Sequence, residues 1–133
     1  MLKIEHLGIA VKKLEQSIPL FEQLLNTPCY KTEKVDAEGV NTAFFKVGES
    51  KIELLEATKA ESPIQKFVDK KGEGIHHIAF EVENIEAEMK RLSALGLELL
   101  NTIPKPGADN KLVCFLHPKT TNGVLIELCQ EKR

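Results

Sequence analysis

Two histidines and two glutamates recur at matched positions in the two halves of this chain. His6 begins the run His-Leu-Gly-Ile-Ala-Val, and His77 begins the similar run His-Ile-Ala-Phe-Glu-Val. Glu53 lies in Lys-Ile-Glu-Leu-Leu, and Glu127 lies in Leu-Ile-Glu-Leu-Cys. Imidazole nitrogens and carboxylate oxygens are common ligands of divalent metal ions. If the two halves fold alike and pair, these four side chains would form one divalent-metal site.

The spacing of these residues indicates a duplicated module. The two histidines are 71 residues apart, as are Phe44 and Phe115, whereas the two glutamates are 74 residues apart. A three-residue insertion before the last strand accounts for the difference, and the turn residues between 118 and 123 provide a place for it. We therefore expect two structurally similar halves.

The hydrophobic pattern predicts the order β-α-β-β-β in each half. The first half has a strand over 3–11, a helix over 13–26 and strands near 29–36, 40–48 and 51–57. A short helix over 62–71, opened by a capping box at Ser62, separates the halves. The second half has a strand over 75–82, a helix from the N-cap Asn84 to Gly96, and strands near 97–103, 111–117 and 124–130. Residues 104–110 are expected to form a loop that lines the site.

Alternation along these strands predicts where the candidate ligands point. Successive side chains of a strand face opposite sides, so His6 shares a face with Gly8 and Ala10, while its bulky neighbours face away. The same alternation turns His77, Glu53 and Glu127 away from the apolar layer. It turns His76 toward that layer, as a packing residue.

Length and composition suit one small enzyme domain. The chain has 133 residues, which predicts a single domain over 1–133, with modules over about 1–60 and 73–133 and a linker helix over about 62–72. A net charge of −2 favours neither nucleic acid nor an anionic membrane as a partner. No apolar run is long enough to span a membrane, and three cysteines without paired spacing suggest reduced thiols. We expect a cytoplasmic protein.

The sequence resembles a known superfamily over nearly its whole length. The similar segments are 4–11, 51–56, the glycine-flanked double histidine of 72–79, 115–119 with its Leu-His-Pro-Lys run, and 123–128. They are similar to the vicinal oxygen chelate superfamily and, within it, to the methylmalonyl-CoA epimerases. The resemblance implies an α+β, glyoxalase-like fold, in which two tandem βαβββ modules form one curved, partly open mixed sheet around a metal site.

The resemblance also implies an activity, a ligand set and partners. His6, Glu53, His77 and Glu127 match the ligands of one divalent ion, with Co²⁺ favoured and Zn²⁺, Ni²⁺ or Mn²⁺ as alternatives. The activity would be epimerisation of methylmalonyl-CoA by a homodimer. Glu127 and Glu53 would move the proton on either face of an enolate. A further carboxylate base of some relatives would lie just after Val40, where this chain has Asn41 or Thr42.

An acyl-CoA substrate also requires contacts to its phosphates. Lys105, Lys111 and Lys119 lie around the late loops and are the candidates. No residues are assigned to an organic cofactor.

Four other functions remain open on the sequence. Glyoxalase I performs a similar proton transfer on a glutathione hemithioacetal, and a substrate assay is needed to separate it from an epimerase. An extradiol dioxygenase would use Fe²⁺ with two histidines and one glutamate, but those chains are commonly much longer. A non-enzymatic bleomycin-binding module would need no metal ligands, and the four candidates here argue against it. A related small metalloprotein of the superfamily is the remaining alternative.

Overall fold

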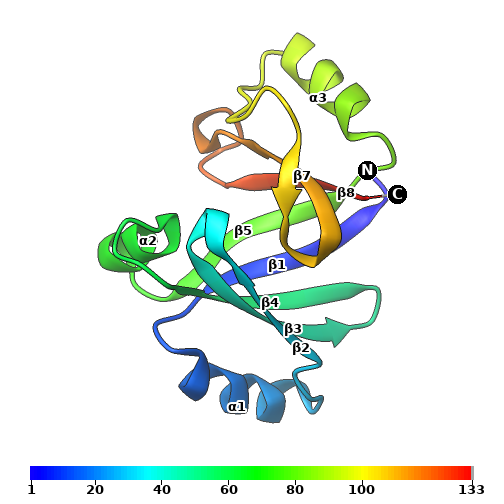
Figure 1. Ribbon diagram of the computed structural model, residues 1–133. Coiled ribbons are helices and arrows are strands. Elements are labelled where there is room, and N and C mark those ends of the chain that lie inside the picture. The colour runs from blue at the N-terminus through cyan, green and yellow to red at the C-terminus, as the bar shows by residue number, and fades with distance from the viewer. Residues whose placement is uncertain (133) are drawn as a thin grey trace. The chain divides into compact units, whose positions relative to one another are not determined.

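The computed structural model describes residues 1–132. In chain order its main elements are β1 (Lys3–Ala10), α1 (Leu14–Leu25), β2 (Lys31–Val35), β3 (Val40–Val47), β4 (Ser50–Ala57), α2 (Pro63–Lys71), β5 (Gly74–Glu81), α3 (Ile85–Ala94), β6 (Lys105–Gly107), β7 (Lys111–Leu116) and β8 (Ile126–Glu131). The predicted order β-α-β-β-β is therefore present twice, with α2 between the two copies (Figure 1).

The chain divides into two compact units, which are described separately. The N-terminal unit is His6–His76, and the C-terminal unit is Met1–Glu5 together with the chain from His77 onward. The first residues join the second module because Leu2 N donates a hydrogen bond of 2.8 Å to Glu81 O at the end of β5. Strand β1 thus begins in one unit and continues in the other.

The N-terminal unit has the strand order β2-β3-β4-β1. The connections β2 to β3 and β3 to β4 are antiparallel hairpins. Strands β1 and β4 pair in parallel, and α1, β2 and β3 carry the chain from one to the other. Helix α1 packs its apolar side against this sheet (Figure 1). The buried core between them consists of Val11, Leu14, Ala43, Phe45 and Leu54.

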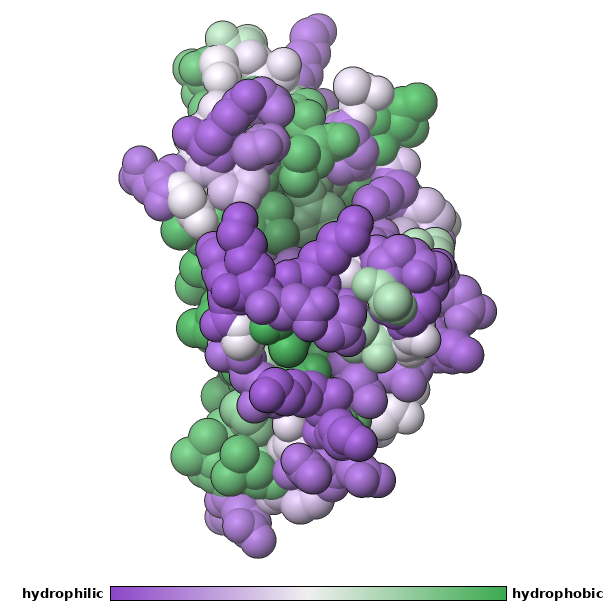
Figure 2. Space-filling view, turned by 90° about the vertical axis from the view of Figure 1, so that its left-hand side faces the viewer, coloured by the Kyte–Doolittle hydropathy of each residue, from purple (hydrophilic) through white to green (hydrophobic). Residues whose placement is uncertain are grey.

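Helix α2 begins where the capping signal predicts. The hydroxyl of Ser62 accepts a hydrogen bond of 3.2 Å from Ile64 N, and Pro63 occupies the first turn. Ile64 packs into a second cluster of this unit with Ala10, Val40 and Leu55. The outer side of α2 is hydrophilic, and Figure 2 shows this over the middle of the view. His76 packs its ring edge-on against Phe67 of α2, with centroids 5.0 Å apart, as expected for a packing residue.

The C-terminal unit has the strand order β5-β8-β7-β6. Strands β5 and β8 pair in parallel, and β7 pairs antiparallel with both β8 and β6. Helix α3 is capped by Asn84, whose side chain accepts a hydrogen bond of 3.0 Å from Ala87 N. The helix packs on β7 and β8 through a buried core of Val82, Ile85, Met89, Leu92, Cys114, Leu116 and Leu128.

The strand predicted over 97–103 is wrong. Within this described range, Leu99 forms only a single bridge, to Leu116. Beyond it the side chain of Asn101 takes the hydrogen bonds of a strand, because its Oδ1 accepts from Phe115 N at 3.0 Å and its Nδ2 donates to Val113 O at 3.2 Å. Backbone pairing resumes only at β6, inside the predicted loop 104–110.

The predicted α+β class, with two βαβββ modules, is confirmed. Every helix among residues 1–132 is too short or too polar to span a lipid bilayer.

Candidate metal centre

The N-terminal unit holds a buried pair formed by His6 and Glu53. Strands β1 and β4 run in parallel with Gly8 opposite Glu53, so His6 lies two residues before the position that faces the glutamate. Nδ1 of His6 is 3.1 Å from Oε2 of Glu53, and both residues are 4% exposed. The two side chains share one face of the sheet, as strand alternation predicted.

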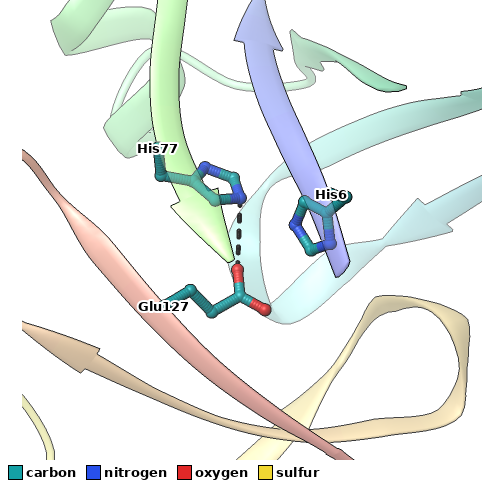
Figure 3. Close-up of side chains that lie close together, drawn as sticks. All are labelled: His6, His77 and Glu127. Carbon is teal, nitrogen blue, oxygen red and sulfur yellow. Dashed lines mark ion pairs between the residues drawn. The ribbon is translucent and has the colours of Figure 1, made fainter. Parts of the chain in front are cut away.

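The C-terminal unit repeats this arrangement with His77 and Glu127. Ala79 lies opposite Glu127 across the parallel strands β5 and β8, and His77 lies two residues before Ala79. Nε2 of His77 is 3.1 Å from Oε1 of Glu127, and both residues are 6% exposed (Figure 3). The ring of Phe115, which is opposite Glu127 on β7, meets the ring of His77 edge-on with centroids 5.9 Å apart.

The opposite face of each strand carries the apolar core. Leu54, next to Glu53, is fully buried in the cluster under α1, and Leu128, next to Glu127, is fully buried in the cluster under α3. The candidate ligands therefore point away from α1 and α3 and are still buried. A buried carboxylate needs a cation or hydrogen-bond donors as partners, because its desolvation is unfavourable.

Each pair fits a fragment of a metal site. Two ligand atoms that each lie about 2.1 Å from a divalent ion, at an angle of about 90–110°, are about 3.0–3.4 Å apart. The separation of 3.1 Å in both pairs is within that range, although it also suits a hydrogen bond between imidazole and carboxylate. Buried imidazole nitrogens and carboxylate oxygens suit Co²⁺, Zn²⁺, Ni²⁺ or Mn²⁺, so these groups can hold such an ion.

Lys111 is buried and serves an ion pair in the C-terminal unit. The residue is 4% exposed, and Nζ lies 3.1 Å from Oε1 of Glu131 and 4.0 Å from Oε2 of Glu5. An ammonium held between two carboxylates is already neutralised, so Lys111 lacks the accessible charge of a phosphate contact. Sequence reasoning missed Glu5, which is only 2% exposed. The sequence did mark this residue, because a charged side chain stands at a strand position that alternation assigns to the apolar face.

The other two candidate lysines are more accessible. Lys119 is exposed, and Nζ lies 2.8 Å from Oε1 of Glu98, an interaction that lowers the pKa of the Glu98 carboxyl. Nζ of Lys105 lies over the ring of Phe115, 5.6 Å from its centroid. Both ammonium groups are therefore held near β7 or the turn after it, by contacts of modest strength.

The strand register shows which residue after Val40 lies on the face of the candidate ligands. Asn41 lies opposite Glu56, whereas Thr42 lies opposite Leu55, two residues from Glu53 on the same face of β4. Thr42, and not Asn41, is therefore on the face of the candidate ligands, and sequence reasoning left these two alternatives open.

Comparisons with known proteins show the family of the chain. Residues 5–115 match the model of the Glyoxalase/Bleomycin resistance protein/Dioxygenase superfamily. The chain is 39% identical over 127 residues to the mitochondrial methylmalonyl-CoA epimerase of Dictyostelium discoideum, which covers 95% of this chain and 76% of that protein. It is 39% identical over 130 residues to the ethylmalonyl-CoA/methylmalonyl-CoA epimerase of Cereibacter sphaeroides, covering 96% of this chain and 97% of that protein.

The solved structures show the same relationship. A Streptomyces coelicolor methylmalonyl-CoA epimerase variant in complex with 2-nitronate-propionyl-CoA is similar with a TM-score of 0.95 and 32% identity, covering 98% of this chain and 95% of that one. This likeness confirms the glyoxalase-like fold. The chain therefore belongs to the glyoxalase/bleomycin resistance protein/dioxygenase superfamily and, within it, to the family of methylmalonyl-CoA epimerases.

Proposed function

We propose that this chain interconverts the 2R and 2S epimers of methylmalonyl-CoA. The observation that carries the proposal is the repetition of a buried His–Glu pair, at equivalent strand positions in both units, in a chain similar to epimerases over nearly its whole length. The reaction removes the proton at C2 of the malonyl thioester and returns it on the opposite face.

His6, Glu53, His77 and Glu127 together hold one divalent ion in this proposal. All four side chains are buried, and each unit contributes one nitrogen and one oxygen ligand. The ion would supply Lewis-acid stabilisation of the enolate oxygens. Co²⁺ is the preferred ion on the sequence resemblance, and Zn²⁺, Ni²⁺ and Mn²⁺ are the alternatives.

Glu127 and Glu53 move the proton. Each carboxylate is held beside a histidine, and the small cross-strand residue opposite it leaves room for a substrate carbon. A carboxylate bound to a metal is a poor base, so at least one glutamate must loosen from the ion when the substrate enters. One carboxylate would then serve each face of the planar enolate.

The remaining parts of the proposal concern partners and location. The chain binds an acyl-CoA, and Lys105 and Lys119 contact its phosphates. The protein acts as a cytoplasmic homodimer. These points rest on the sequence resemblance and on the accessible ammonium groups near β7 and the turn after it.

Deuterium exchange tests the function. The metal-loaded protein, incubated with methylmalonyl-CoA in D₂O, should introduce deuterium at C2 and equalise the two epimers, which mass spectrometry and chiral analysis can follow. The methylglyoxal–glutathione adduct serves as the comparison substrate, because glyoxalase I is the competing function. Isomerisation of the adduct without exchange at C2 of methylmalonyl-CoA would overturn the proposal.

A further inference from the structure

The side chain of Thr42 carries a buried hydroxyl without a hydrogen bond. The residue is 1% exposed. Among residues 1–132, its Oγ1 is the buried side-chain polar atom that has no hydrogen-bond partner. Burying an unsatisfied hydroxyl destabilises a fold, and a valine of nearly the same shape would avoid that penalty. A threonine here therefore calls for an explanation outside folding.

The strand register turns this hydroxyl toward the face of Glu53. Phe44 lies opposite Glu53, and Thr42 lies two residues earlier on β3, opposite Leu55. Residues two apart along a strand share a face, so Thr42 and Glu53 are diagonal neighbours. The Cα atoms of such neighbours are roughly 7–8 Å apart, so the two side chains lie near each other on that face.

The surroundings of Thr42 explain why its hydroxyl has no protein partner. The adjacent side chains on its own face, Val40, Phe44 and Leu55, are apolar and buried. On the other neighbouring strand, β2, Thr42 faces Glu33, whose Oε1 lies 3.6 Å from Nζ of Lys31. The hydroxyl is thus a polar group in an apolar lining, on the face of a candidate metal ligand.

We propose that Oγ1 of Thr42 donates a hydrogen bond to an oxygen of the acyl group of the bound thioester, on the side of Glu53. This inference rests on the proposed epimerase function and extends it by a substrate-binding residue. An alkyl hydroxyl is too weak a base to remove the C2 proton at neutral pH, so Thr42 binds and orients the substrate. Its single donor suits the carbonyl or carboxylate oxygens of a malonyl thioester.

The test uses variants that separate binding from folding. Thr42→Val removes the hydroxyl and keeps the shape, Thr42→Ser keeps the hydroxyl, and Thr32→Val makes the same change at an exposed site on β2. The readouts are the melting temperature, the dissociation constant of methylmalonyl-CoA by calorimetry on metal-loaded protein, and KM and kcat for C2 exchange.

We expect opposite effects on folding and on binding. Thr42→Val should melt at or above the temperature of the unaltered chain, yet bind the substrate about tenfold more weakly, as loss of a hydrogen bond predicts. Thr42→Ser should restore most of the affinity, and Thr32→Val should change neither readout. If Thr42→Val keeps the unaltered affinity for methylmalonyl-CoA and the unaltered rate of C2 exchange, this inference is overturned but the proposed function is not. Absence of exchange in the unaltered chain would overturn the proposed function, and this inference with it.

Discussion

Ala79 directly faces Glu127 across the parallel strands β5 and β8. Gly8 faces Glu53 in the same way across β1 and β4. Each glutamate therefore has a very small cross-strand neighbour on the face that it shares with its histidine. Because cross-strand neighbours on one face approach most closely, a larger residue at either position would press on the carboxylate.

Enlarging Ala79 should therefore impair metal binding. Ala79 is fully buried, so Ala79→Leu should lower the free energy of unfolding by about 1–3 kcal/mol through overpacking. It should also weaken Co²⁺ binding by about 10–100-fold, the usual effect of disturbing a ligand's support. Calorimetric titration with Co²⁺ measures this. Ala94→Leu, at an exposed position of α3, is the matched control. Full affinity in Ala79→Leu would show that the neighbour does not position Glu127.

The two glutamates should act on different epimers. Glu127→Gln and Glu53→Gln keep the shape but lose the base, so each should slow epimerisation by about 10²–10⁴-fold. Each variant should still exchange the C2 proton of one epimer without inverting it, because the other carboxylate remains on the opposite face. Deuterium incorporation into each pure epimer measures this. Glu15→Gln, at an exposed position of α1, is the control. If both variants lose C2 exchange equally with both epimers, that result would contradict a two-base reaction.

The three candidate lysines should separate into two classes. Lys119→Ala and Lys105→Ala should raise KM for methylmalonyl-CoA several-fold, and the effect should shrink at high salt because it is electrostatic. Lys111→Met should instead destabilise the fold by about 3 kcal/mol, since it removes a buried ammonium from beside the buried carboxylate of Glu5. Steady-state kinetics and urea unfolding distinguish the classes. If Lys111→Met has an unchanged urea unfolding midpoint but a raised KM for methylmalonyl-CoA, Lys111 would again be a candidate phosphate contact.

The buried thiols should be inert at neutral pH. Burial raises the pKa of Cys114 above its usual value, whereas Cys29 is partly exposed. Iodoacetamide should therefore label Cys29 first in the folded protein, as mass spectrometry can show, and should spare Cys114 until the chain unfolds. Because the folded state holds this proton more tightly, its contribution to stability is present below about pH 8.5 and lost as pH rises further. Early labelling of Cys114 would contradict this.

Asn101 should stabilise the irregular segment before β6. Asn101→Ala removes the acceptor of Phe115 N and a donor to Val113 O, which should lower the free energy of unfolding by about 1–3 kcal/mol. Asn101→Asp keeps the acceptor for Phe115 N and loses the donor to Val113 O, so its effect should be intermediate. Urea denaturation measures both. Equal stability of Asn101→Ala and the unaltered chain would show that the amide only occupies space.

The sequence by itself determined the repeat and the face of each candidate ligand. Alternation along a strand has a period of two and depends only on the local backbone, so His6, Glu53, His77 and Glu127 could be turned away from the apolar layer without knowledge of the pairing. The capping residues Ser62 and Asn84 similarly marked helix starts, because their hydrogen bonds are to residues within three positions.

Tertiary structure alone decided how distant segments meet. The neutralisation of Lys111 depends on Glu5, which is more than a hundred positions away, and the irregular pairing at Asn101 depends on the backbone of β7. The orphan hydroxyl of Thr42 likewise follows from the apolar side chains that β3 and β4 place around it. The periodicity of the sequence does not show which residues meet in such contacts, because the contacts arise from the packing of distant segments and not from the local backbone.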